Sequence, residues 1–261
     1  MYGLSLSHHR PDLRIYGGKD ADMKKFPFAV LMESAIYRKH KGVRKVEYAP
    51  FCSATALSST WTLTASHCIG RKHVWLEREL LFIRYNTTGE PQRKKILKII
   101  LSPNVNLNKD VMANDIGLVK TDSIELPSYA KLSSVDYTSL VGQEAIQLGY
   151  GNTHTSYEKD PGTNRTLKMM DVMLMKCGRI PISMIYIIMC TVPKCGVTEF
   201  VCPGDSGGTV LHSSGVIGVH SASIRCFQQK NSTIFGKYNY ASINVPVSPY
   251  LDWIRSEITK D

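Results

Sequence analysis

Short β-rich runs recur along almost the whole chain, and no other feature constrains the fold as strongly. They extend from Phe28–Met32 to Tyr240–Val245, turn-forming residues separate them, and hardly any helical periodicity interrupts them. Strands at this spacing predict an all-β protein built as an antiparallel barrel or sandwich. With 261 residues, the chain is long enough for one large all-β unit or for two moderate domains that share an interface.

The C-terminus differs from the rest of the chain, because Ser248–Ile258 predicts one short helix. Ser248 is the expected N-cap and Pro249 the first helical residue. The apolar residues expected on one face of this helix are Leu251, Ile254 and Ile258. Further upstream, Thr121–Ser134 is the best candidate for a linker between two β-rich halves.

The chain is strongly basic, with a formal net charge of +10 and basic clusters at Arg38–Lys45 and Gln92–Lys95. Such a charge balance is typical of proteins that bind nucleic acid, heparin-like polyanions or acidic membranes. We expect no nucleic-acid binding, since the chain has no zinc-finger spacing, no RNP-like aromatic motif and no basic helix with heptads. The simpler interpretation places the clusters in solvated loops, and a polyanion-binding patch is the alternative.

Two further patterns exclude classes of protein. The longest apolar run, Ile180–Met189, is too short to span a bilayer as a helix, so we expect a buried strand there and no membrane partner. The seven cysteines include no CxxC pair, so a zinc ribbon or a thioredoxin-type site is not expected. We therefore predict neither a metal nor another cofactor.

The compartment is indicated by cysteines and glycosylation signals. Sequons at Asn86, Asn164 and Asn231 fit exposed loops of a secreted, extracellular chain. The N-terminal segment Met1–Arg14 contains no apolar stretch of the kind found in signal peptides. We expect the sequence to be truncated at its start, because the cysteine pattern described below needs an oxidising compartment.

The stretch CPGDSGG, Cys202–Gly208, places a serine in a glycine-rich cradle. A serine hydroxyl is a weak nucleophile until a base removes its proton, and that base needs an orienting carboxylate. His67 follows an apolar run, and Asp115 stands immediately before another, where its carboxylate can be buried. Ser206, His67 and Asp115 are thus candidates for nucleophile, base and orienting group.

The motifs TASHC, NDIGLV and GDSGG, in this order, resemble those of the trypsin-like (chymotrypsin-family) serine proteases, and the resemblance extends from Ile15 to Ile258. It implies two antiparallel Greek-key β-barrels with a short C-terminal helix. Residues 15–127 would form the first barrel and residues 128–261 the second, together one peptidase domain, 15–258. Residues 1–14 would be a pro-segment.

The same resemblance assigns catalytic roles. Ser206 would attack the scissile carbonyl, His67 would act as general base and then general acid, and Asp115 would orient and stabilise the imidazolium. The backbone N–H groups of Gly204 and Ser206 would form the oxyanion hole. Ser66 stands where the family most often has alanine, a small change that we expect to be tolerated.

An activation junction is also implied. The stretch RIYGG, Arg14–Gly18, resembles the family's cleavage site, with Tyr16 where valine is usual. An activating protease would cut after Arg14, and the freed ammonium of Ile15 would pair with Asp205 and order the oxyanion loop. The intact chain would then be a zymogen.

The resemblance further implies disulfides Cys52–Cys68, Cys177–Cys190 and Cys202–Cys226. The first joins residues in two β-like runs and would hold the loop that carries His67. The last would tie the nucleophile loop to the wall of the specificity pocket. Cys195 is left over, as a free thiol or an intermolecular link.

The specificity pocket departs from the family pattern. Phe200 takes the position, six residues before Ser206, where enzymes that cleave after Lys or Arg have an aspartate. A basic P1 side chain would lose its partner there, so we expect a preference other than Lys or Arg, with small or apolar P1 residues favoured. The other residues assigned to the pocket are His220, Ser221, Ala222, Ser223 and Tyr238.

We therefore predict a secreted, monomeric serine endopeptidase that is made as a zymogen and hydrolyses peptide bonds through an acyl-enzyme. Its partners would be a protein or peptide substrate, the activating protease, and protease inhibitors or polyanions. Two alternatives remain open at this point: a non-catalytic serine-protease homologue that acts as a binding or regulatory module, and a polyanion-binding basic protein.

Overall fold

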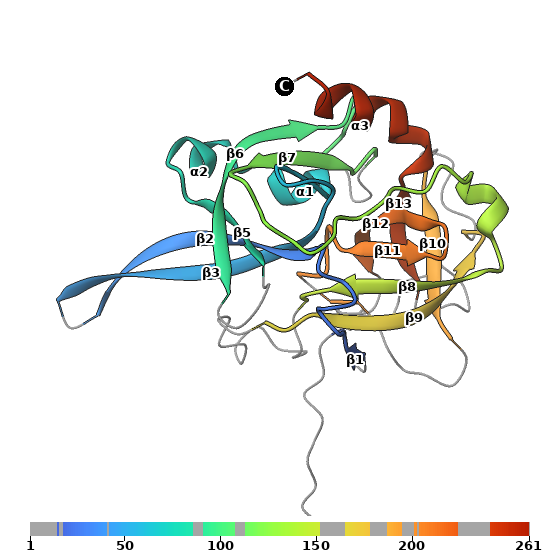
Figure 1. Ribbon diagram of the computed structural model, residues 1–261, viewed down its shortest axis with the longest axis horizontal. Coiled ribbons are helices and arrows are strands. Elements are labelled where there is room, and N and C mark those ends of the chain that lie inside the picture. Colours follow the sequence, from blue (N-terminus) through green and yellow to red (C-terminus); the bar gives the residue numbers. More distant parts are fainter. Residues whose placement is uncertain are drawn as a thin grey trace, which may run out of the picture.

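A computed structural model of the chain describes Ile15 and residues 18–40, 42–85, 91–107, 113–151, 165–177, 187–194, 201–202, 204–223 and 241–260. Two closed antiparallel β-sheets form its body, and short helices lie around them (Figure 1). The sheets meet along an apolar interface. The all-β class and the double-barrel architecture predicted from the sequence are confirmed.

The first sheet is a closed six-stranded barrel with the strand order β2-β3-β4-β7-β6-β5. Its strands are β2 (Ala29–His40), β3 (Val43–Ala56), β4 (Trp61–Thr64), β5 (Leu81–Tyr85), β6 (Gln92–Leu101) and β7 (Gly117–Thr121). Val30, Leu63 and Ile83 are fully buried in its core. Closure leaves no unpaired strand edge in the body of the barrel, which limits edge-to-edge association.

The second sheet has seven strands in the order β1-β9-β10-β13-β12-β11-β8, and an additional β8–β9 pairing closes a ring. Its strands are β1 (Lys19–Asp20), β8 (Glu144–Gly149), β9 (Lys168–Met175), β10 (Met189–Pro193), β11 (Thr209–His212), β12 (Gly215–Ser223) and β13 (Ser242–Pro246). Strict alternation of buried and half-buried residues along β9 places Met170, Val172 and Leu174 in the core.

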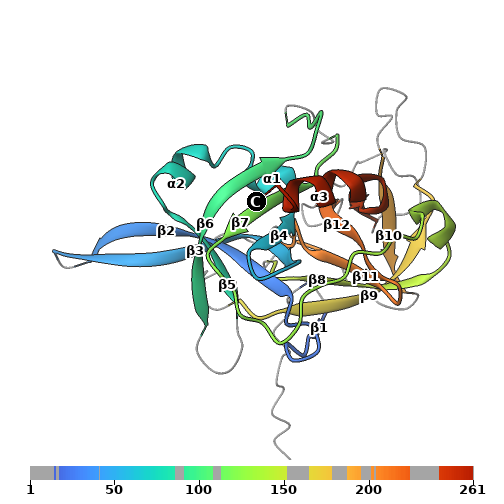
Figure 2. The same ribbon diagram turned by 45° about the horizontal axis from the view of Figure 1, so that its top comes forward.

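The N-terminal end of the described chain packs on the second sheet, and the C-terminal end packs on the first barrel. Near the N-terminus, Ile15 is buried in the core of the second sheet, and β1 pairs with β9. Near the C-terminus, Tyr250 and Ile254 belong to the same buried cluster as the core of the first barrel. In Figures 1 and 2, the terminal helix α3 (Leu251–Ile258) accordingly lies where the two halves meet. The ends thus tie the two sheets together.

The helices differ in part from the prediction. The terminal α-helix begins at Leu251, after a 3₁₀ turn η3 (Ser248–Tyr250), so the expectation that Ser248 caps it is wrong. The Ser248 hydroxyl instead accepts a hydrogen bond from the Tyr137 N–H, at 3.3 Å. The sequence also gave no sign of three short helices, α1 (Ser66–Ile69), α2 (His73–Glu77) and η1 (Tyr137–Leu140). Helices of one turn are too short to show a periodicity.

The basic clusters lie in strands and not in loops, which corrects the simpler interpretation of the sequence. Arg38–Lys45 forms the end of the β2–β3 hairpin, where Arg38 pairs with Lys45 and Lys39 with Arg44 across the strands. Lys41, at its tip, is outside the described residues. Figure 1 shows this hairpin projecting well beyond the barrel, so its side chains stay in solvent. The second cluster, Gln92–Lys95, begins β6.

Two other predicted segments are only partly tested. The stretch Thr121–Ser134 starts with the last residue of β7, and no helix or named strand follows in it; its role as a linker stays a prediction. Most of Ile180–Met189 lies outside the described residues, and β10 begins at Met189. None of the helices described in this structure combines the length and the apolar character that crossing a membrane requires.

Candidate active site

A histidine and a buried aspartate form the centre of the site. The Thr64–Gly117 pair of the β4–β7 ladder places Asp115, just before β7, opposite the start of α1, which carries His67. Asp115 Oδ2 lies 2.7 Å from His67 Nδ1, and Oδ1 accepts the His67 backbone N–H at 2.8 Å. The Asp115 side chain is 0% exposed and the His67 side chain 21%. The aspartate therefore fixes both the ring and the backbone of the histidine.

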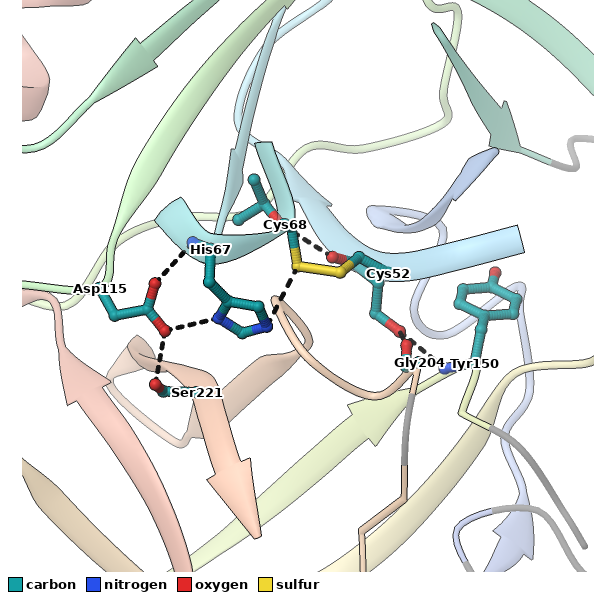
Figure 3. Close-up of a disulfide and its surroundings, with 9 residues drawn as sticks. Cys52, His67, Cys68, Asp115, Tyr150, Gly204 and Ser221 are labelled. Carbon is teal, nitrogen blue, oxygen red and sulfur yellow. Dashed lines mark hydrogen bonds and ion pairs between the residues drawn. A yellow bond between two sulfur atoms is a disulfide. The ribbon is translucent and has the colours of Figure 1, made fainter. Parts of the chain in front are cut away.

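A third hydrogen bond reaches this carboxylate from the second sheet. The hydroxyl of Ser221, on β12, donates to Asp115 Oδ2 at 2.5 Å (Figure 3). The sequence assigned Ser221 to the specificity pocket, and the structure shows that its hydroxyl holds the aspartate. Hydrogen bonds to an ionised carboxylate are stronger than those between neutral groups, so these three donors fix its orientation.

The imidazole ring lies between Asp115 and a disulfide, as Figure 3 shows. Cys52 and Cys68 form this disulfide, and His67 Nε2 lies 3.8 Å from the Cys68 sulfur. Within the described residues, Cys52, His67 and Cys68 are the one group of three side chains close enough to share a metal ion. Because the two sulfurs are bonded to each other, they offer no thiolate ligand.

The backbone of the nucleophile loop makes hydrogen bonds to both sheets, to β3 of the first and to β12 of the second. The Ser206 carbonyl accepts the Ser53 N–H at 2.8 Å, and the Gly207 N–H donates to the His220 carbonyl at 2.8 Å. Gly207 has φ +80°, and a Cβ at this position would collide with the Ser53 carbonyl oxygen and the Thr64 hydroxyl. Only glycine fits this close approach, which explains why a glycine follows Ser206.

Ser206 and His67 thus lie at the junction of the two sheets, next to the same disulfide. Ser206 contacts the residue after Cys52, and the His67 ring lies against Cys68. In the part of the chain that the structure describes, no hydrogen bond joins the Ser206 hydroxyl to the imidazole. Catalytic hydrogen bonds are often long without substrate and tighten in the complex.

Asp205, beside the nucleophile, is buried, and its two oxygens accept backbone hydrogen bonds. Oδ1 accepts from the Gly151 N–H at 2.7 Å and Oδ2 from the Cys202 N–H at 2.8 Å. Burial raises the pKa of Asp205 to about 6, although these hydrogen bonds and the charge of Arg165 lower it. The predicted pairing with Ile15 concerns a cleaved chain, whereas the structure is that of the intact chain. That pairing stays a prediction.

His220, which the sequence assigned to the pocket wall, belongs to a buried polar network inside the second sheet. Gln147 Nε2 lies 3.0 Å from His220 Nδ1 and 3.1 Å from Asn244 Oδ1, and Thr191 completes the network through Gln147 Oε1 and Asn244 Nδ2. Nδ1 also lies 3.3 Å from the acceptor Asn244 Oδ1. The Gln147 amide makes the shorter contact and can only donate, so Nδ1 accepts from it and the ring is neutral. Burial lowers the pKa of His220 to about 4.

Sequence reasoning missed the other members of this network. Gln147 and Asn244 are polar residues inside the apolar runs Glu144–Tyr150 and Tyr240–Val245. A polar residue at a core position of a predicted strand needs hydrogen-bond partners, and that signal was present in the sequence. Which partners they find depends on the strand pairing of the folded sheet.

Some of the remaining predicted site residues lie in the part of the chain that the structure describes, and the others lie outside it. The disulfide Cys177–Cys190 is present. Ala222 is half-buried on β12, and Ser223 ends that strand. Gly204 has φ +99° and Cys202 is buried. The predicted residues outside the described part of the chain are Arg14, Phe200, Tyr238, Cys195, Cys226, Asn86, Asn164 and Asn231.

Two joined β-barrels that hold a histidine–aspartate pair next to a serine loop define the double-barrel serine proteases as a class. A profile of the trypsin family matches residues 15–254. The chain therefore belongs to the trypsin family, and it is a serine endopeptidase.

Individual relatives agree with this assignment. Trypsin of Sus scrofa is 27% identical over 255 residues, which cover 95% of this chain and 96% of that protein. CLIP domain-containing serine protease B9 of Anopheles gambiae is 26% identical over 276 residues, covering 94% of this chain and 63% of that protein. The mouse serine protease neuropsin is similar in fold, with a TM-score of 0.66 at 21% identity over 92% of this chain and 98% of its own.

Proposed function

We propose that Ser206, His67 and Asp115 are the catalytic residues of this endopeptidase. Ser206 Oγ attacks the scissile carbonyl carbon, and His67 Nε2 takes the hydroxyl proton, so that a C–O bond forms and the carbonyl electron pair moves to the oxygen. The intermediate collapses as the C–N bond breaks. The imidazolium gives its proton to the departing amine, which leaves an acyl-enzyme.

Water completes the cycle by the same route. His67 removes a proton from water, the resulting hydroxide attacks the ester carbon, and the proton returns to Ser206 as the acid product leaves. The backbone N–H groups of Gly204 and Ser206 stabilise the oxyanion in both steps. Asp115, held by Ser221, keeps His67 in one tautomer and stabilises its charged form.

The observation that carries this proposal is the double hydrogen bond from His67 to the buried Asp115. Pre-steady-state kinetics with a p-nitrophenyl ester tests it, since acyl-enzyme formation predicts a burst of about one equivalent of nitrophenol. The Ser206→Ala variant should show no burst. A burst of the same size in Ser206→Ala would contradict the assignment, as would a wild-type protein, cleaved after Arg14, that gives none.

We further propose that the chain is a zymogen that an activating protease cleaves after Arg14. The freed Ile15 ammonium would pair with Asp205, because a full positive charge nearby stabilises the ionised form of this buried carboxylate. Treatment with an Arg-specific protease should raise the burst amplitude at least tenfold in the wild type and leave Arg14→Gln unchanged. Equal activation of the two proteins would place the functional cleavage elsewhere.

For the substrate, we propose protein or peptide chains with a small or apolar P1 residue. Phe200 would remove the carboxylate that a Lys or Arg side chain needs, although relatives of this chain carry the name trypsin. Cleavage profiling on a peptide library separates the two outcomes. Preferential cleavage after Lys or Arg would show that Phe200 is not at the base of the pocket.

We propose that the protein is secreted and acts as a monomer, and that protease inhibitors are among its partners. Two disulfides fit an oxidising compartment, and Cys202–Cys226 would be a third. The glycosylation sites would be Asn86, Asn164 and Asn231. The peptidase domain would span residues 15–258, with its halves joined at residues 127 and 128. Peptide mapping with and without glycosidase, on protein from a secretory host, tests the disulfide and the glycans together.

A second function, binding of a polyanion, is favoured by the projecting β2–β3 hairpin. Lys39 and Arg44 lie side by side on one face, and Arg38 and Lys45 on the other. Lys39→Glu with Arg44→Glu should lower the salt concentration at which heparin releases the protein. Lys131→Glu with Lys176→Glu, at exposed positions elsewhere, is the charge-matched control. Equal shifts for the two double variants would exclude a hairpin-specific site.

A further inference from the structure

Ser53, on β3 next to the disulfide that touches His67, makes hydrogen bonds that no part of the proposed reaction uses. Its side chain is buried, with 2% of the residue exposed. The hydroxyl donates to the Gly204 carbonyl oxygen at 2.8 Å and accepts the Tyr150 N–H at 2.8 Å. Figure 3 shows Gly204 and Tyr150 together beside Cys52, on the side of the disulfide away from Asp115. One hydroxyl of the first barrel thus joins two backbone segments of the second sheet.

The backbone of Ser53 holds the same loop at a second point. Its N–H donates to the Ser206 carbonyl at 2.8 Å, and its carbonyl accepts the Thr64 hydroxyl at 3.0 Å. The loop from Gly204 to Ser206 is therefore fixed to one residue of β3 at both ends. Between these two points stands Asp205, whose carboxylate accepts the hydrogen bonds from Gly151 and Cys202.

We propose that Ser53 is a positioning residue for the oxyanion hole. Gly204 has φ +99°, a conformation that glycine adopts as readily as others, so its own backbone preference does not hold its peptide groups in place. The hydrogen bond from Ser53 fixes the Gly204 carbonyl, and so limits rotation of the residue whose N–H is proposed to meet the oxyanion. Without the hydroxyl, the buried Gly204 carbonyl and the Tyr150 N–H both lose this hydrogen-bond partner. Because unpaired buried polar groups cost free energy, loop conformations that give these groups other partners become more favourable.

The expected effect follows from what the oxyanion hole contributes. Loss of one donor from such a hole lowers kcat by about 10²- to 10³-fold. Displacing a donor without removing it should lower kcat by a smaller factor, so we expect Ser53→Ala to lower kcat about 10- to 100-fold. KM should stay within about threefold, because the Ser53 hydroxyl has no role in the proposed substrate pocket.

Thr55 provides a matched control on the same strand. Its hydroxyl is buried and lies 2.6 Å from the Thr209 hydroxyl across the same interface, whereas the hydroxyl bonded to the Gly204 carbonyl is that of Ser53. Thr55→Val removes a buried hydrogen bond between the two sheets, here between two side chains, and leaves the hydrogen bonds of Ser53 to Gly204 and Ser206 in place. We expect Thr55→Val to lower the melting temperature, as Ser53→Ala also does, while its kcat stays within about twofold of the wild type.

The test uses the full-length protein, cleaved after Arg14, and measures two rates for each variant. One is kcat on an activated ester, and the other is the rate of inactivation by a fluorophosphonate, whose phosphoryl oxygen occupies the oxyanion hole. Both should fall about 10- to 100-fold in Ser53→Ala and stay near the wild-type value in Thr55→Val. If Ser53→Ala does not fold, Ser53→Gly removes the same hydroxyl and should lose at least fivefold.

Wild-type rates in a folded Ser53→Ala or Ser53→Gly variant would overturn the inference. Equal loss of rate in Thr55→Val would also overturn it, since the effect would then be general to the interface. The inference rests on the proposed function, and the two fail differently. If the wild type itself shows no burst and no inactivation, the proposed catalytic residues are wrong, whereas a reactive wild type with an equally reactive Ser53→Ala contradicts only the role of Ser53.

Discussion

The buried, neutral His220 makes folding stability depend on pH in a way that can be calculated. Protonating the imidazole in the folded state would place a charge in the core of the second sheet and a second donor opposite the Gln147 amide. The unfolded chain takes up that proton freely. The stabilising contribution of neutral His220 is therefore complete above about pH 6.5 and is lost as the pH falls toward 4.

The size of the effect follows from the two pKa values. In the folded chain the pKa of His220 is about 4, and in the unfolded chain it is near 6.5. Between pH 7.5 and pH 4.5, His220 should thus lower the free energy of unfolding by about 2.5 kcal/mol. His220→Asn should abolish this contribution, because its amide oxygen takes the place of Nδ1 as acceptor from Gln147 but does not titrate in this range.

Urea unfolding at the two pH values, in a Ser206→Ala background that prevents self-digestion, measures this contribution. Acidification should reduce the free energy of unfolding of the parent by about 2.5 kcal/mol more than that of His220→Asn. The opposite contribution of Asp205, whose pKa is raised to about 6, is common to both proteins and cancels. His212→Asn, at the end of β11 near the surface, is the control and should behave like the parent. An equal loss in parent and His220→Asn would refute the neutral, buried network.

Three more predictions concern the site and its support. Asp115→Asn should lower kcat about 10⁴-fold by leaving the imidazole in the wrong tautomer, and a loss below tenfold in ester turnover would contradict its role. Ser221→Ala should lower kcat about tenfold with KM unchanged, since it removes one hydrogen bond to the charged carboxylate; an unchanged kcat would mean that Asp115 is held without it. Replacing both Cys52 and Cys68 by alanine opens a loop with a sequence separation of 16 and should reduce the free energy of unfolding in urea by about 3 kcal/mol. A loss below about 1 kcal/mol would show that this disulfide contributes little.

The sequence predicted those features that local pattern determines. Alternating apolar residues between turns indicated a β fold, and Asp115 was selected because it stands immediately before an apolar run in which its carboxylate can be buried. The structure adds that this run, β7, pairs with β4, the strand that precedes His67. In such cases the functional side chain lies within a few residues, in sequence, of the strand or helix that positions it. A short motif is then enough to locate the group.

Contacts between distant residues were not predictable in the same way. The Ser53 hydroxyl meets the Gly204 carbonyl across a sequence separation of 151 residues and the Tyr150 N–H across 97. Such pairs depend on how two complete sheets pack, which no local pattern encodes. Pairing between sequence-distant strands within one sheet is equally absent from local patterns. It places β1 beside β9, and it surrounds His220, which was interpreted as a pocket residue, with core side chains of the second sheet.

Charged strands were a second source of error. The Arg38–Lys45 segment has the composition of a solvated loop, yet its described residues belong to two paired strands. Both faces of these strands remain in water, and backbone pairing, with surface contacts such as Arg38–Glu47, sets their structure. Without a buried face, there is no apolar alternation to indicate a strand.

The central claim is that Ser206 is the nucleophile of an active endopeptidase. The most direct test is peptide mapping by mass spectrometry. The protein is first cleaved after Arg14 and then reacted with a fluorophosphonate. The account predicts one phosphonyl group per molecule, located on Ser206, and none in Asp115→Asn within the time that labels the wild type completely. Complete cleavage with no adduct on Ser206, or an adduct on another residue, would contradict it.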